Sequence, residues 1–310
     1  MSRRGLAGII LILLVVAATL VLVLSPGGPG GRAKGDAVAV VHVAGPIQDS
    51  VGTPFGPVAT PVALRERLET AERDPRVRAV VLRLNSPGGT VAASQEMADL
   101  IGSFSLPIVV SMGDLAASGG YYLSTRADRI VAQPGTLTGS IGVIMTILDM
   151  QGLLDKIGVK YDAVTAGEHK DMLAPGRMTP ERRAILQTMA DQLYGQFVTA
   201  VAEGRGLPEQ EVRALATGQP YTGTQALELG LVDALGGLDT AIEQAEELAG
   251  IEDAELVELR PSFLEQLFGG SAGLKGTLER LTTGGTSAED LTLLRTLLDT
   301  VAAPRYGVTW

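Results

Sequence analysis

Three short turns carry the side chains that could do chemistry in this sequence. The first, NSPGGT at 85–90, has two adjacent glycines after an apolar run. Such a turn exposes backbone N–H groups that can bind an anion, either a phosphate or the oxyanion of an acyl-transfer intermediate. The second, DLAASGGYY at 114–122, sets Ser118 among small residues that let a substrate approach its hydroxyl. The N–H of Gly119 would then point toward the oxyanion; alternatively, Ser118 is only a helix N-cap.

The third turn, AGEHKDM at 166–172, offers two candidate bases, His169 and Lys170. A serine nucleophile needs such a base. A triad of Ser118, His169 and an aspartate is one arrangement, and a pair of Ser118 with Lys170 is the other. A lysine can act as the base only when it is buried, because desolvation must bring its pKa from about 10.4 toward neutrality. The residue types alone do not decide between the two.

Composition excludes several other kinds of site. The 310 residues include no cysteine, which rules out disulfides, thiol nucleophiles and Cys-ligated metals. Only two histidines are present, so a three-histidine metal site is excluded. A net charge of −10 argues against a nucleic-acid partner. With 45% hydrophobic and 19% charged residues, the chain has the material for a folded core.

An alternation of strand and helix patterns must position the three turns. β-branched runs predict strands at 36–44, 77–84, 106–112, 129–132 and 160–165. Helices are predicted at 61–74, 90–104, 118–125, 180–203, 209–216, 224–229 and 239–248. This order predicts an α/β fold with parallel strands. Each candidate turn then follows a strand directly.

The N-terminal segment predicts a membrane anchor. Residues 5–24 form a run of 20 uncharged residues, and a helix of that length spans about 30 Å, the thickness of a bilayer core. Arg3 and Arg4 precede it, which favours a single-pass protein with a cytoplasmic N-terminus and a catalytic domain outside the cell membrane. We expect four regions: tip and anchor (1–24), flexible linker (25–35), catalytic domain (36–260) and a poorly defined C-terminal extension (261–310).

Five segments occur in an order that resembles a known family. They are LRLNSPGGTV, LAASGGYYLST, GTLTGSIGV, GEHKDMLAP and YTGTQALELGLVDALGGLDTAIE. Together they resemble the signal peptide peptidase A group of membrane-anchored serine proteases, over roughly residues 37–249. The resemblance implies a Clp protease/crotonase-like fold, a spiral of ββα units, preceded by one transmembrane helix.

The resemblance also implies roles for individual residues. Ser118 would be the nucleophile and Lys170 the general base. Ser140, in GSIGV, would hydrogen-bond the lysine and orient it. The N–H groups of Gly89 and Gly119 would form the oxyanion hole.

Other positions and partners follow from the same resemblance. Gly88 competes with Gly89 as an oxyanion donor, His169 has no catalytic role, and Asp114 stands where a small residue is more common. No metal and no cofactor are implied. The expected substrates are hydrophobic peptides such as cleaved signal peptides, and the expected assembly is a homo-oligomeric ring at the membrane. Two alternatives stay open: a stomatin-operon-type protease that cleaves an oligomerising membrane partner, and a crotonase-like acyl-CoA enzyme.

Overall fold

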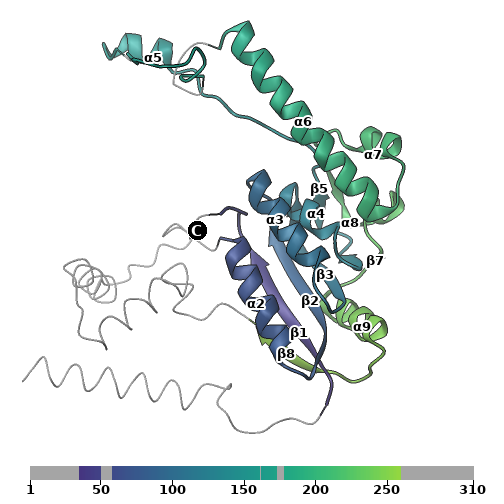
Figure 1. The fold of residues 1–310 in the computed structure, drawn as a ribbon. Coiled ribbons are helices and arrows are strands. Elements are labelled where there is room, and N and C mark those ends of the chain that lie inside the picture. Colours follow the sequence, from purple (N-terminus) through teal and green to yellow (C-terminus); the bar gives the residue numbers. More distant parts are fainter. Residues whose placement is uncertain (1–34, 50–57, 161, 173–177, 260–310) are drawn as a thin grey trace, which may run out of the picture. The chain divides into compact units, whose positions relative to one another are not determined.

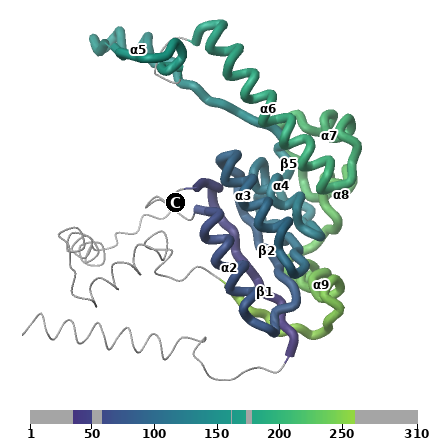
Figure 2. Tube along the Cα trace, in the orientation of Figure 1, coloured from purple at the N-terminus to yellow at the C-terminus, as the bar shows by residue number. Residues whose placement is uncertain are grey.

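The computed structural model describes residues 35–49, 58–160, 162–172 and 178–259 (Figures 1 and 2). The predicted anchor (1–24), nearly all of the linker and the C-terminal extension (261–310) lie outside these residues. Within the described part of the chain, no helix is both long enough and apolar enough to cross a membrane.

A mainly parallel sheet of eight strands organises the described residues. Its main order is β6-β5-β3-β2-β1-β8. Outside this order, β4 pairs with β3, and β7 pairs with β4. The strands are β1 (Ala37–Ala44), β2 (Val77–Ser86), β3 (Ile108–Ala117), β4 (Arg129–Ala132), β5 (Leu137–Gly139), β6 (Pro220–Thr222), β7 (Ala234–Leu235) and β8 (Glu255–Leu259). The β5–β6 pair is antiparallel, and the other pairs are parallel.

Helices cover both faces of the sheet because its central strands are apolar on both sides. The helices are α2 (Pro61–Arg73), α3 (Val91–Gly102), α4 (Gly119–Ser124), α5 (Gln151–Lys156), α6 (Pro180–Arg205), α7 (Glu209–Leu215), α8 (Gly223–Glu228) and α9 (Leu238–Ala249). Side chains of α2 and α3, such as Leu64 and Met97, pack in the larger core cluster. Ala241 and Ala245 of α9 belong to a second cluster with Val38, Val81 and Val109. Figure 1 shows α2 and α3 beside β1 and β2, and α9 apart from those two helices.

The structure confirms the strands predicted at 36–44, 77–84, 106–112 and 129–132, which are β1 to β4. The strand predicted at 160–165 is wrong, because the described residues of that segment form no strand. They belong to the segment between β5 and α6. None of the described residues from 142 to 172 is buried; we call residues 142–172 the arm. A β-branched pattern there has no neighbouring strand to pair with.

Candidate active site

Ser118 lies at the sharp turn between β3 and α4. Its φ of 52° and ψ of −121° are unusual for a residue with a side chain and cost about 1–3 kcal/mol. Ser118 stands at the N-cap position of α4, but its side chain makes no capping hydrogen bond to that helix. The backbone is held instead: Ser118 N–H donates to the Gly139 carbonyl at 2.8 Å, and the Ser118 carbonyl accepts from Tyr122 N–H at 2.8 Å. Ser118 is half-buried. Because its hydroxyl does not cap α4, the hydroxyl is available to react with a substrate.

The glycine turn after β2 lies directly against the Ser118 turn. Gly88 has a φ of +93°, and a Cβ placed on it would be 2.6 Å from Gly119 N and 2.9 Å from Ser118 Cβ. A Cβ on Gly119 would lie 3.2 Å from Gly89 N. Two turns that are about 30 residues apart in the sequence therefore meet, because they follow neighbouring parallel strands.

Gly89 is fixed by an isolated β-bridge to Ile47, which the sequence patterns did not reveal. Ile47 N–H donates to the Gly88 carbonyl at 2.9 Å, and Thr90 N–H donates to the Ile47 carbonyl at 2.9 Å. These bonds leave the N–H of Gly89 directed away from Ile47. A Cβ on Gly89 would overlap the Ile47 backbone. Among the residues that the structure describes, neither Gly89 N–H nor Gly119 N–H has a hydrogen-bond acceptor, so both donors are available to a developing negative charge.

Ser140 lies next to the Ser118 turn, at the end of β5. Its φ is 49°, so Ser140 and Ser118 both hold a strained conformation. Ser140 N–H donates to the Gln219 carbonyl at 3.1 Å, and its hydroxyl donates to the Gly218 carbonyl at 3.2 Å. Because Gly139 accepts the bond from Ser118 N–H, Ser140 is one residue away from a direct contact of Ser118.

Lys170 and His169 lie on an exposed turn of the arm. No hydrogen bond or ion pair between Ser118 and either candidate base occurs in the described part of the chain. The turn is tied to the start of α6, where Asp171 forms an ion pair of 2.6 Å with Arg182. His169 Nε2 lies 4.0 Å from a carboxylate oxygen of Glu181. The structure therefore brings Ser118, Ser140 and the glycines together, and it shows no contact between Ser118 and either candidate base among the described residues.

One set of side chains has the composition of a metal site. Ligand atoms of Glu168, His169 and Glu181 lie within 4.8 Å of one another. Glu168 and Glu181 are exposed and His169 is partly exposed, and exposed acidic groups of this kind are common without an ion. We assign no metal to it. The exposed Asp114, whose role the sequence left open, is not part of this set.

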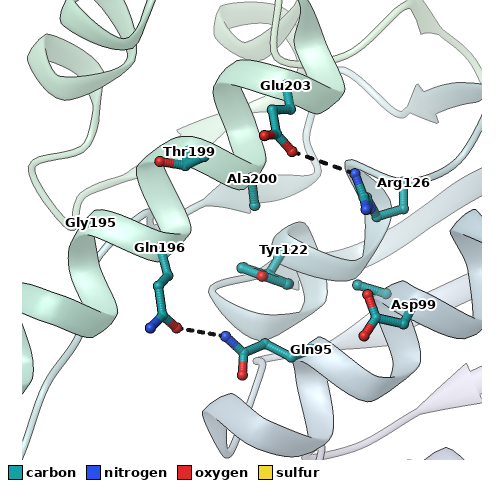
Figure 3. A pocket seen from close by; sticks show the side chains of 10 residues that line it. Gln95, Asp99, Tyr122, Arg126, Gly195, Gln196, Thr199, Ala200 and Glu203 are labelled. Atoms are coloured by element: carbon teal, nitrogen blue, oxygen red, sulfur yellow. Dashed lines mark hydrogen bonds and ion pairs between the residues drawn. The ribbon is translucent and has the colours of Figure 1, made fainter.

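A hollow between α3, α4 and α6 is separate from the Ser118 turn (Figure 3). Gln95 donates to Gln196 at 2.8 Å across it, and Arg126 lies 3.7 Å from Glu203. Tyr122 points into the hollow in Figure 3 and packs edge-on against Phe197. These contacts dock α6 on α3 and α4, and none of the proposed site residues lines the hollow.

Comparison with known proteins gives consistent results. The family model for Peptidase family S49 matches residues 103–252. A Synechocystis sp. protein that carries a protease name is 39% identical over 226 residues, covering 71% of this chain and 81% of that protein. Protease 4 of Salmonella typhi is 39% identical over 225 residues, 72% of this chain but 36% of its own length. Serine protease SPPA, chloroplastic, of Arabidopsis thaliana is 33% identical over 279 residues, 83% of this chain and 40% of its length.

Among solved structures, a lysine-to-alanine mutant of the 1510-N membrane-bound stomatin-specific protease, in complex with a substrate peptide, has a similar fold. The TM-score is 0.51 at 18% identity, over 76% of this chain and 98% of that one. This likeness concerns the fold alone. The three relatives described above all carry protease names, which disfavours the crotonase-like alternative. The family model matches residues 103–252, and the Synechocystis relative is 39% identical over 81% of its own length. The chain therefore belongs to peptidase family S49, together with the signal peptide peptidase A-type proteases.

Proposed function

We propose that this S49 peptidase is a membrane-anchored serine endopeptidase that degrades hydrophobic peptides, such as cleaved signal peptides. Ser118 is the nucleophile, and Lys170 is the general base that takes its proton and returns it to the leaving amine. Gly89 and Gly119 donate to the oxyanion, and Ser140 orients the lysine. No metal or cofactor takes part.

One observation carries the proposal. Ser118 has a strained backbone conformation, and its hydroxyl makes no capping hydrogen bond to α4. It lies beside two glycine N–H groups that have no acceptor among the described residues. A nucleophile needs an exposed oxygen, and the tetrahedral intermediate needs donors that are already in place. Each such donor contributes about 3 kcal/mol to transition-state stabilisation in other acyl-transfer enzymes.

The exposed position of Lys170 indicates where the site is incomplete. A general base must lie within hydrogen-bond reach of the proton that it takes, and Lys170 has no such contact with Ser118 among the described residues. We propose that association with further copies of the chain buries the arm and brings a Lys170 side chain to Ser118. The arm supports this idea, because half of the exposed large apolar side chains of the described residues lie on it: Ile144, Leu148, Leu153, Ile157, Val159 and Val164.

The substrate class rests on two supports. A relative in Enterococcus faecium, 37% identical over 198 residues, bears the name of a signal peptide peptidase. The apolar run at 5–24 would also hold the enzyme at the bilayer, where such peptides remain.

Hydrolysis of apolar peptides by the full-length protein in detergent tests the proposal. We expect Ser118→Ala and Lys170→Ala to abolish cleavage and His169→Ala to retain it. His169 is the matched control because it lies on the same turn with similar exposure. Cleavage by Ser118→Ala would show that Ser118 is not the nucleophile. Cleavage by Lys170→Ala, together with loss of cleavage in His169→Ala, would show that His169 and not Lys170 is the base.

A further inference from the structure

The register between β2 and β3 shifts just before the nucleophile. Asn85 of β2 alone spans the interval in which β3 has residues 113–115. A bulge of this kind bends a strand and redirects the side chains that follow it. It also takes backbone groups out of the strand ladder, so these groups need other partners.

Side chains from the two neighbouring strands and the β4–β5 turn supply those partners. The contacts are Thr136 Oγ1 to the Gly113 carbonyl (2.7 Å), Leu115 N–H to Asn85 Oδ1 (3.1 Å) and Thr138 Oγ1 to the Ala116 carbonyl (2.7 Å). Thr136 and Thr138 are both buried. The bulge itself is held at Gly113 and Leu115, and Thr138 binds the carbonyl of Ala116, where the register with β2 resumes. None of these three side chains is among the proposed site residues.

Thr138 is the contact nearest to the nucleophile. Its side chain has no exposed surface, and its hydroxyl holds the carbonyl two residues before Ser118. The next residue, Gly139, accepts the hydrogen bond from Ser118 N–H at 2.8 Å. A serine at a φ of 52° keeps that conformation only when its surroundings hold it there.

We propose that Thr138 is a positioning residue for the Ser118 nucleophile, acting through the β3 backbone with support from Asn85. This inference rests on the proposed function of Ser118. Thr138 does not touch substrate. It sets the direction in which the Ser118 hydroxyl emerges beside the glycine N–H groups.

The test measures the rate at which a fluorophosphonate probe labels Ser118 in the full-length protein, followed by intact mass. The final extent of labelling counts folded sites, whereas the rate constant reports how well each site is arranged. Thr138→Val has the same shape without the hydroxyl, and we expect its rate constant to fall about tenfold or more, because small misplacements of reacting groups are costly. Thr138→Ser keeps the donor and should label within about threefold of the wild-type rate.

Thr125→Val is the matched control. Thr125 is also buried, and its hydroxyl donates to the Tyr122 carbonyl at 2.7 Å, but it lies at the far end of α4. We expect its rate constant to stay at the wild-type value. Equal slowing in Thr125→Val and Thr138→Val, or a wild-type rate in Thr138→Val, would overturn the inference.

A second pair of variants covers the case in which Thr138→Val does not fold. Asn85 is exposed, so its replacement is easier to tolerate. Asn85→Leu removes the acceptor of Leu115 N–H, whereas Asn85→Asp keeps one. We expect slower labelling in the first variant and near wild-type labelling in the second; equal rates in both would overturn the inference. Wild-type protein that is not labelled at Ser118 at all would instead refute the proposed function.

Discussion

At residue 119 a neighbouring serine, not the backbone conformation, requires glycine. A Cβ on Gly119 would overlap Ser94 Oγ, and Ser94 is buried beneath the turn with its hydroxyl bonded to the Thr90 carbonyl at 2.8 Å. We expect Gly119→Ala to lower the free energy of unfolding by about 1–3 kcal/mol, as overpacking does in other cores. Urea denaturation measures it. Adding Ser94→Ala should restore most of the loss; a Gly119→Ala variant as stable as wild type would contradict the packing.

A side chain is tolerated even less at residue 89, because a Cβ on Gly89 would overlap backbone atoms of Ile47 and not a side chain. The Ile47 peptide cannot move away from a new Cβ without breaking its bonds to Gly88 and Thr90. We expect Gly89→Ala to abolish phosphonate labelling of Ser118 and to destabilise the fold more than the Gly119→Ala, Ser94→Ala double variant does. Labelling at the wild-type rate would show that Gly89 N–H is not needed.

The meeting of the two candidate turns could be predicted from the sequence, but several of their contacts could not. The small residues around Ser118 and the paired glycines suggested acyl-transfer chemistry, and the structure places both turns together. The contact with Ile47 was not predictable, because a single bridge between distant segments leaves no periodic pattern. The position of Lys170 relative to Ser118 was not predictable either, since it does not follow from the folded single chain.

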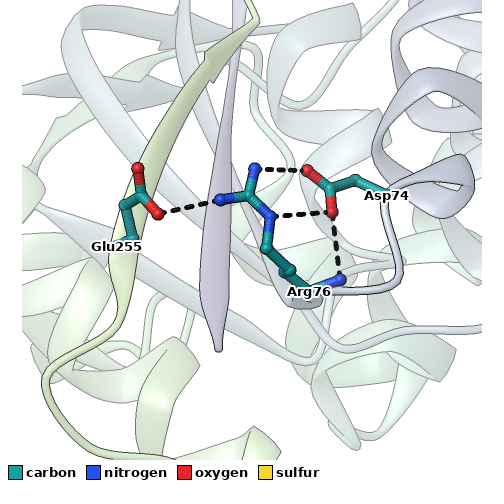
Figure 4. Close-up of polar contacts among 3 residues, drawn as sticks. All are labelled: Asp74, Arg76 and Glu255. Atoms are coloured by element: carbon teal, nitrogen blue, oxygen red, sulfur yellow. Dashed lines mark hydrogen bonds and ion pairs between the residues drawn. The ribbon is translucent and has the colours of Figure 1, made fainter. Parts of the chain in front are cut away.

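At the scale of elements, an ion-pair network joins the start of β2 to the edge strand β8 (Figure 4). Arg76 lies 2.7 Å from Asp74 in the α2–β2 turn and 2.9 Å from Glu255 of β8. The hydrogen bond from Arg76 holds the pKa of the Asp74 carboxyl below its ordinary value of 3.8. The folded state therefore favours the ionised carboxylate.

The sign of the pH dependence follows from that direction. A carboxyl with a lowered pKa in the folded state stabilises the protein above its unfolded value and ceases to do so as the pH falls through the folded value. We expect Asp74→Asn to lower the melting temperature at pH 7, with the difference shrinking below the ordinary value of 3.8. Thermal melts of the two proteins at several pH values measure this; a difference that grows at low pH would contradict it.

The long strands could be predicted from the sequence, and the three shortest strands could not. β1, β2 and β3 are 8 to 10 residues of mostly apolar sequence, buried on both faces. β5 and β6 have 3 residues each, and β7 has 2. Such strands are defined by their partners and not by a repeating pattern. The prediction of a strand at 160–165 was wrong for the converse reason, because this β-branched segment has no neighbouring strand to pair with among the described residues.

At the scale of the whole molecule, the exposed apolar side chains of the arm predict self-association. We expect the full-length protein in detergent to sediment as an oligomer, and Ile157→Asp to give smaller species that fold but do not cleave peptides. Val62→Asp is the control, because Val62 is exposed to a similar degree, 57% against 61%, but lies on α2. An active monomer, or equal dissociation in both variants, would contradict the role of the arm.

The central claim is that the amine of Lys170 activates Ser118, and one measurement tests it most directly. This is the rate constant for phosphonate labelling of Ser118, in the assembled full-length protein, as a function of pH. The account predicts a wild-type rate that rises between about pH 6 and pH 9 and falls by at least about 100-fold in Lys170→Ala, the usual contribution of a general base. A Lys170→Ala variant that labels at the wild-type rate, with the same dependence on pH, would contradict it.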